Sequence, residues 1–315
     1  MELEPEPRTH GARTDVAERR TTVSTMLVFL QMASLQLGAV FATGLAARIG
    51  AVPAATLRLG FAAVFTWIAV RPKVSRITRG DLPLVVTFGA VLALMNASFF
   101  AAISRLPLGV ATTLEFLGPL VVVLIGAARF RDRIWGLVAA AGVVLLTWNV
   151  GHLDGWGIGF ALVAATCRAL YIVGSKRIGQ RYGNADGLCF ALAVGFVLAL
   201  PFGAVIGGRQ LLQQDVLLTG MLVALLSSAV PYLCDLYALR HLPSHVFGIL
   251  VSMAPAGGAL AGFLLLGQVL RPVQAAGIAL VVAASIGALM GTRRRARVTS
   301  AASTVEPESG SPARS

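Results

Sequence analysis

The chain has 315 residues, of which 57% are hydrophobic and 13% are charged, whereas a soluble domain carries roughly 25% charged residues. This composition excludes a soluble globular protein and indicates an all-α membrane protein, because lipid cannot satisfy free backbone groups. The net charge of +12 does not indicate a nucleic-acid-binding protein, since the excess of basic residues lies in short loops and tails between apolar segments.

Ten apolar segments predict ten membrane-spanning helices, because a hydrocarbon core of about 30 Å requires about 20 helical residues. The polar N-terminal residues 1–22 and the Ser/Ala/Pro-rich residues 292–315 are expected to be disordered cytoplasmic tails. The expected spans are 24–45, 52–70, 82–103, 107–128, 134–150, 158–175, 187–207, 216–238, 243–266 and 272–291.

The distribution of Lys and Arg predicts the orientation. If the N-terminus is cytoplasmic, 20 of the 26 basic residues fall in cytoplasmic segments and four in outer segments, while Arg58 and Arg168 lie within spans. Cytoplasmic loops are enriched in Lys and Arg. We therefore expect a multi-pass protein of the inner or plasma membrane with both termini in the cytoplasm.

The chain also repeats itself. Residues 102–107 (AISRLP) are echoed by residues 238–243 (ALRHLP), and Pro119 and Pro255 are separated by the same 136 residues. The repeats divide the chain into a five-helix half at 23–150 and a second at 151–291. Because five is odd, the second half would be inverted, which is an architecture of secondary transporters; chance repetition of small apolar motifs is the alternative.

Four charged residues lie inside the expected spans, where a charge is costly and usually faces a partner or a wet cavity: Arg58, Glu115, Arg168 and Asp235. Glu115 could bind a proton or a substrate ammonium, or could tether helices through an arginine. Arg58, at a similar expected depth, could bind a substrate carboxylate or pair with Glu115. Arg168 could pair or bind an anionic group, and Asp235 lies nearer the cytoplasmic end of its span.

Uncharged polar and helix-bending residues complete the candidate site. Asn96, Gln36 and Tyr171 could line a substrate cavity, although interhelical hydrogen bonds are their more common use. Pro119 and Pro255 are expected inside the fourth and ninth spans, where each would remove a backbone donor and could form a gating bend.

Nothing in the sequence indicates an enzyme, a cofactor or a metal site. The four histidines lie outside or at the edges of spans, and neither an HExxH motif nor an ATP-binding P-loop is present. Any energy source would be an ion gradient or the gradient of the substrate itself. The GxxxG patterns at 258–262 and 287–291 indicate close helix packing within or between protomers, so a homodimer stays open.

The first half of the chain contains several distinctive motifs: Leu-Arg-Leu at 57–59, Asn96, Leu-Pro-Leu-Gly at 106–109, Leu-Glu-Phe at 114–116 and Gly-Pro-Leu at 118–120. With these motifs the chain resembles the drug/metabolite transporter superfamily with EamA-type repeats, and most closely its bacterial threonine/homoserine exporter branch. The resemblance covers about residues 24–291. One departure is Arg168, which stands where this family usually has an aromatic residue.

The resemblance implies a function in export. The expected substrates are small amino acids such as threonine and homoserine, moved by alternating access coupled to protons. Another small metabolite or a toxic compound is the alternative substrate. This alternative stays open because Arg168 stands where the family usually has an aromatic residue. The expected partners are thus the substrate, protons and the lipid bilayer, with no nucleic acid.

Overall fold

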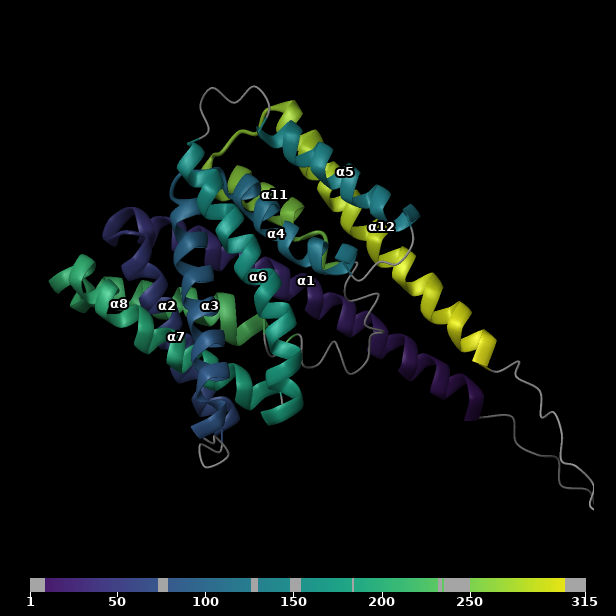
Figure 1. Cartoon of the computed structure of the whole chain (residues 1–315), viewed down its shortest axis with the longest axis horizontal. Helices are drawn as coiled ribbons and strands as arrows, with labels where there is room; N and C mark the ends of the chain where they lie inside the picture. Colours follow the sequence, from purple (N-terminus) through teal and green to yellow (C-terminus); the bar gives the residue numbers. More distant parts are fainter. Residues whose placement is uncertain are drawn as a thin grey trace, which may run out of the picture.

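The computed structural model describes residues 9–72, 79–125, 130–147, 154–182, 184–231, 234 and 250–303, and within these ranges all regular structure is helical (Figure 1). The long helices are α1 (Thr9–Ile49), α2 (Ala51–Val70), α3 (Leu82–Ile103), α4 (Leu108–Ile125), α5 (Phe130–Thr147), α6 (Gly155–Tyr182), α7 (Asn184–Gly207), α8 (Gln214–Ala224), α11 (Ala254–Leu266) and α12 (Pro272–Ser303). Short helical turns cover Arg79–Asp81, Gly208–Leu212 and Leu225–Ala229.

Helix boundaries follow local backbone chemistry. Gly50, with a φ of 90°, separates α1 from α2. Arg71 ends α2 and Gly267 ends α11 in the left-handed conformation, and each donates its N–H to a carbonyl of the last helical turn. Such left-handed caps satisfy carbonyls that a helix end would leave without partners. The predicted limits of the second and third spans agree with α2 and α3 to within one residue.

The first and last helices extend beyond the expected spans. Residues 9–22 belong to α1 and residues 292–303 to α12, whereas both stretches were expected to be disordered. Alanine and arginine, which recur in both stretches, are strong helix formers, so a helix that starts in the membrane continues into them. The remaining tail residues, 1–8 and 304–315, lie outside the described part of the chain.

The eighth and ninth expected spans are interrupted. Helix α8 passes into a π-helical turn at Leu225–Ala229, and α11 begins only at Ala254, after a turn at residues 252–253. Pro255 was expected inside a helix but lies in the first turn of α11. A proline is favoured there because the first helical N–H groups have no intrahelical partner.

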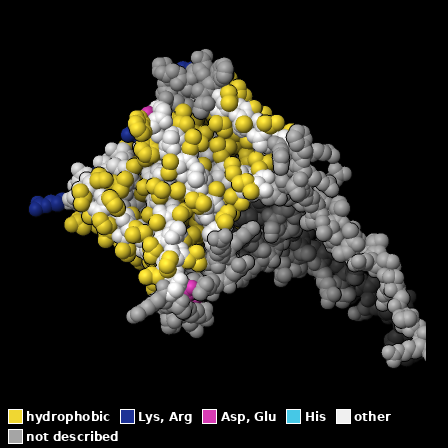
Figure 2. Space-filling model, in the orientation of Figure 1, with side chains coloured by type: hydrophobic (Ala, Val, Ile, Leu, Met, Phe, Trp, Pro, Cys, Tyr) yellow, Lys and Arg dark blue, Asp and Glu magenta, His cyan; other side chains and the backbone are white. Residues whose placement is uncertain are grey.

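Much of the described surface is apolar. Five helical segments are long and apolar enough to cross a membrane: Thr22–Ile49, Ala51–Val70, Leu82–Ile103, Gly155–Ser175 and Asp186–Leu212. Shorter apolar helical segments are Leu108–Val122, Ile134–Leu146, Gln214–Ala229, Ala254–Leu266 and Pro272–Gly287. Figure 2 shows hydrophobic side chains over most of the described surface on one face, with few charged groups at its margins. This surface suits burial in lipid.

Helices from the two halves of the chain pack against one another. The contacts include α2 with α7, α3 with α6 and α7, α4 with α6 and α11, and α5 with α12. Glycines allow the closest approaches. A Cβ on Gly142 of α5 would lie 2.8 Å from the carbonyl oxygen of Gly277 on α12, and one on Gly195 of α7 would lie 2.9 Å from that of Gly89 on α3. These crossings therefore accept only glycine.

Candidate substrate site

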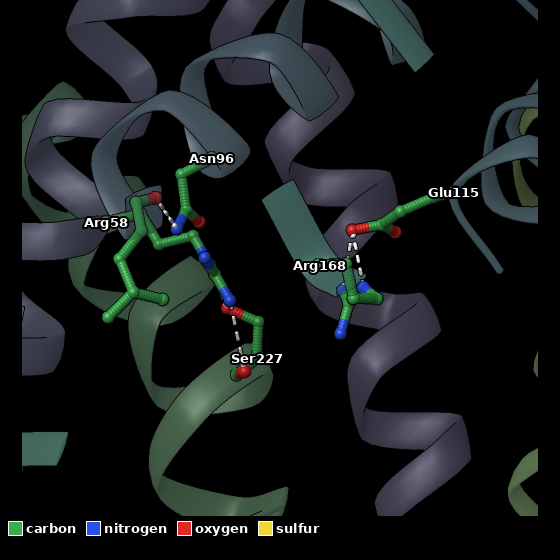
Figure 3. Close-up of polar contacts among 6 residues, drawn as sticks. Arg58, Asn96, Glu115, Arg168 and Ser227 are labelled. Atoms are coloured by element: carbon green, nitrogen blue, oxygen red, sulfur yellow. Dashed lines mark hydrogen bonds and ion pairs between the residues drawn. The ribbon is translucent and has the colours of Figure 1, made fainter. Parts of the chain in front are cut away.

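Glu115 and Arg168 form an ion pair between α4 and α6 (Figure 3). The Nε and Nη2 atoms of Arg168 donate to the same oxygen, Oε1 of Glu115, at 2.9 and 2.6 Å. The Glu115 side chain is only 10% exposed, whereas 37% of the Arg168 side chain remains accessible. The Glu115 carboxylate is thus buried in the bundle, while part of the Arg168 side chain remains accessible.

The sequence of α4 brings these two residues together. Gly118 lies one turn after Glu115, and a Cβ at Gly118 would collide with the carbonyl oxygen of Ala165 on α6. The absence of a side chain therefore lets the two backbones cross within reach of the ion pair. Pro119 lies inside α4 as expected. Because proline lacks an N–H, it cannot offer the usual intrahelical hydrogen bond to the carbonyl of Glu115.

Arg58 binds Ser227, in the π-helical turn that follows α8, rather than Glu115. Its Nε donates to Oγ of Ser227 at 2.7 Å, and its Nη2 donates to the backbone carbonyl of Ser227 at 3.3 Å (Figure 3). Of the two roles considered for Arg58, pairing with Glu115 is not present in this structure. Among the described residues, no carboxylate lies within ion-pair distance of Arg58.

The partner of Arg58 lies in the π-helical turn of α8. Within that turn the N–H of Val230 bonds the carbonyl of Leu225, five residues earlier. Val230 is therefore not available to the carbonyl of Leu226, which instead accepts a hydrogen bond from Oγ of Ser34 on α1 at 2.7 Å. Turns of this kind are frequent at functional sites. The distorted turn thus presents successive carbonyls to α1 and α2.

Three charged groups gather in this region. Arg58, Arg168 and Glu115 are close enough for their charges to interact. Two cations and one anion leave an excess positive charge among the described residues of the cluster. An excess charge in a poorly hydrated site favours the binding of an oppositely charged group. Asp235, the fourth predicted charge, lies outside the described residues.

The uncharged candidates have mainly structural contacts. The amide nitrogen of Asn96 donates to the carbonyl of Leu92 in its own helix at 2.8 Å. Tyr171, one turn beyond Arg168, stacks on Phe88 with ring centroids 5.4 Å apart. Gln36 on α1 donates to the carbonyl of Ala254, at the start of α11, at 3.0 Å. Gln36 therefore links α1 to the start of α11.

Two further ion pairs lie outside the buried cluster, in loops or at helix ends. Arg48, near the end of α1, pairs with Asp215 at the start of α8. Arg105, after α3, pairs with Asp154 before α6 at 2.6 Å. The hydrogen bond from Arg105 holds the pKa of Asp154 below its usual range. Asp154 also accepts from the N–H of Trp156 at 3.0 Å and thereby caps α6.

Ser227 and Ser34 were not among the predicted site residues. The signal in the sequence that points to Ser227 is Pro231, which follows it by four residues and cannot donate to its carbonyl in an α-helix. The same spacing separates Glu115 from Pro119. A polar residue four positions before a proline in an apolar helix thus marks both halves of this site. Within the described residues, no group of three or more His, Cys, Asp or Glu side chains could hold a metal.

Comparisons with known proteins identify the family. The profile of the EamA-like transporter family matches residues 155–290. The threonine/homoserine exporter RhtA of Escherichia coli (strain K12) is 34% identical over 280 residues, which cover 87% of this chain and 93% of the exporter. The RhtA protein of Salmonella typhimurium (strain LT2) has the same identity and coverage.

Two more distant similarities agree with this result. A probable terminal-alkyne amino-acid exporter of Streptantibioticus cattleyicolor is 26% identical, over 75% of this chain and 82% of its own length. A solved crystal structure with 17% identity superposes with a TM-score of 0.60, over 87% of this chain and 99% of that chain, so the fold is shared. The chain is therefore a multi-pass membrane protein that belongs to the EamA-like transporter family, in the branch of the RhtA exporters.

Proposed function

We propose that the protein exports small amino acids such as threonine and homoserine across the inner membrane. The similarity to RhtA over 93% of that exporter's length supports this substrate class. The observation that carries the mechanism is the ion pair of Glu115 and Arg168, which is placed between helices of the two halves and beside the second cation, Arg58. Such a cluster offers opposite charges to the two ends of a zwitterion.

The architecture we propose is ten spans in two inverted five-helix halves, with both termini cytoplasmic. Under this scheme α1 to α5 correspond to α6, α7, α8, α11 and α12. The scheme then relates the contact of α3 with α6 to that of α8 with α1, and the contact of α4 with α6 to that of α11 with α1; all four contacts occur. In Figure 1 the start of α1 and the end of α12 leave the bundle in the same direction, which supports termini on one side.

The coupling we propose is exchange of protons for substrate by alternating access. A proton from the outside occupies Glu115, and the transporter returns to the inward-facing form. The substrate ammonium then displaces this proton into the cytoplasm, while Arg58 or Arg168 holds the substrate carboxylate. When neither proton nor substrate is bound, the ion pair with Arg168 stabilises the Glu115 carboxylate inside the bundle, and protonation of Glu115 in this scheme opens that pair.

Transport in sealed vesicles with an imposed pH gradient tests this proposal. We expect threonine movement to depend on the gradient in the wild type and to lose that dependence in Glu115→Gln, which cannot carry the proton. Asn96→Leu is a matched control, because in the described part of the chain the Asn96 amide donates to the carbonyl of Leu92 in its own helix. Unchanged gradient dependence in Glu115→Gln would remove Glu115 from the coupling step.

A further inference from the structure

We infer that the Arg58 guanidinium is the group that binds the substrate carboxylate, and that Ser227 in the π-helical turn of α8 is the residue that positions it. This inference rests on the proposed amino-acid transport and assigns one end of the substrate to one arginine. It makes the distorted turn, rather than the ion pair of Glu115 and Arg168, the recognition element for the carboxylate.

The first step is the difference between the two arginines. Arg168 already gives two hydrogen bonds to a carboxylate oxygen of Glu115. Arg58 donates only to the hydroxyl and the carbonyl of Ser227, both uncharged, in the described part of the chain. A charged acceptor binds a guanidinium more strongly than a neutral one. An incoming carboxylate therefore gains more at Arg58, because it competes there with a 3.3 Å bond to a carbonyl.

The second step is the reason that Ser227 has a carbonyl to offer. Pro231 cannot donate to it in the α-helical register, because proline has no N–H. In the π-helical register the N–H of Val230 bonds Leu225, so Leu226 also takes an outside donor, the hydroxyl of Ser34. The sequence thus leaves the carbonyls of Leu226 and Ser227 without α-helical donors, and side chains of α1 and α2 donate to them instead.

The third step is the rigidity of this arrangement. The Ser227 hydroxyl donates to the carbonyl of Val223 at 2.6 Å while it accepts from Nε of Arg58. Gly38 on α1 packs against the same turn, since a Cβ there would lie 3.1 Å from Cβ of Ser227. The Nε contact therefore fixes one edge of the guanidinium. When a carboxylate replaces the carbonyl at Nη2, the Nε contact keeps the arginine in place.

The test compares threonine with threoninamide, which keeps the ammonium but lacks the carboxylate, in vesicles that contain the full-length protein. We expect the wild type to prefer threonine. In Ser227→Ala, KM for threonine should rise about 10-fold with little change in kcat, as the loss of a hydrogen bond to a charged group implies. KM for threoninamide should stay constant, and Ser227→Thr should restore the preference.

The matched control is Ser228→Ala, which removes a hydroxyl from the same turn that forms no hydrogen bond with Arg58 in the described structure. If Ser227→Ala changes the threonine-to-threoninamide ratio no more than Ser228→Ala does, or lowers kcat for both substrates equally, the positioning role of Ser227 is overturned. A wild-type protein that transports neither compound would instead contradict the proposed function. The two failures are therefore distinguishable.

Discussion

Two helix crossings that correspond under the proposed inverted repeat use different chemistry. Where α4 crosses α6, a continuous helix contributes the carboxylate of Glu115, which pairs with Arg168. Where α11 crosses α1, α11 begins at Ala254, and the backbone carbonyl of Ala254 accepts a hydrogen bond from the uncharged amide of Gln36. Both crossings lie close to a proline, Pro119 or Pro255. If the inverted repeat holds, the site is less symmetric than the scaffold, since ionised groups lie at only one of these two described crossings.

The largest expected change in stability comes from the charged crossing of α4 and α6. Arg168→Met leaves Glu115 buried without its partner, which should lower the free energy of unfolding by about 3–5 kcal/mol. Gln36→Met at the other crossing loses one neutral hydrogen bond, and we expect about 1 kcal/mol. Denaturant titration of the protein in mixed micelles measures both.

A double variant provides the control for this prediction. Adding Glu115→Gln to Arg168→Met removes the orphaned charge and should recover most of the lost stability, because a neutral amide is cheaper to bury than an ion. It should not recover transport. Equal losses in Arg168→Met and Gln36→Met would contradict the contrast between the crossings.

The second effect concerns the closeness of the backbones. Gly118→Ala places a Cβ against the carbonyl of Ala165 on α6, and such overpacking costs about 1–3 kcal/mol. Gly257→Ala on α11 meets only the flexible side chain of Gln36, at 3.5 Å, so a change within about 0.5 kcal/mol is expected. The same titration ranks the two variants, and the reverse order would show that the crossing of α4 and α6 is the looser one.

The smallest effect concerns the exposed ion pair of Arg105 and Asp154, which joins the end of α3 to the start of α6. Because the pKa of Asp154 is lowered by its hydrogen bond with Arg105, this pair contributes stability above the pKa of an unfolded aspartate, about 3.9. The contribution is lost as pH falls through the lower folded pKa. Asp154→Asn keeps an N-capping oxygen and removes only the charge.

The thermal midpoint measured from pH 7 to pH 3 checks this sign. The wild type should exceed Asp154→Asn slightly at pH 7, and the two should converge as pH falls below 4. High salt should shrink the difference at pH 7, because exposed pairs are screened. A difference that is constant across the whole range would show that the charge of Asp154 has no effect on stability.

Much of the fold could be predicted from the sequence. The third expected span, 82–103, coincides with α3, because apolar length and the Asp81 and Ser104 boundaries are local features. The extension of α1 back to Thr9 was not predicted, because the polar composition of residues 9–22 favours disorder, whereas the alanines and arginines among them also favour helix. The break before Ala254 was missed because hydropathy does not distinguish one helix from two short ones.

The charged residues of the cluster could be named from the sequence, whereas their contacts could not. Glu115, Arg58 and Arg168 stood out because charges are rare in apolar segments. Which of them meet depends on the faces that the helices present to one another. The Gly118 contact with Ala165 sets that face for Arg168, while the π-helical turn brings Ser227 to Arg58. Both depend on contacts between residues distant in sequence, which a single chain does not reveal.

The contact of Gly142 with Gly277 has a consequence for motion. Main chains that touch directly leave α5 and α12 no room to slide or roll against each other, because packed interiors do not deform continuously. The two helices should therefore move together as one rigid body. They contact the rest of the described bundle through α4 and α11, which carry Glu115 and Ala254. A tilt of this pair would displace α4 and α11 at the same time, one from each half of the chain.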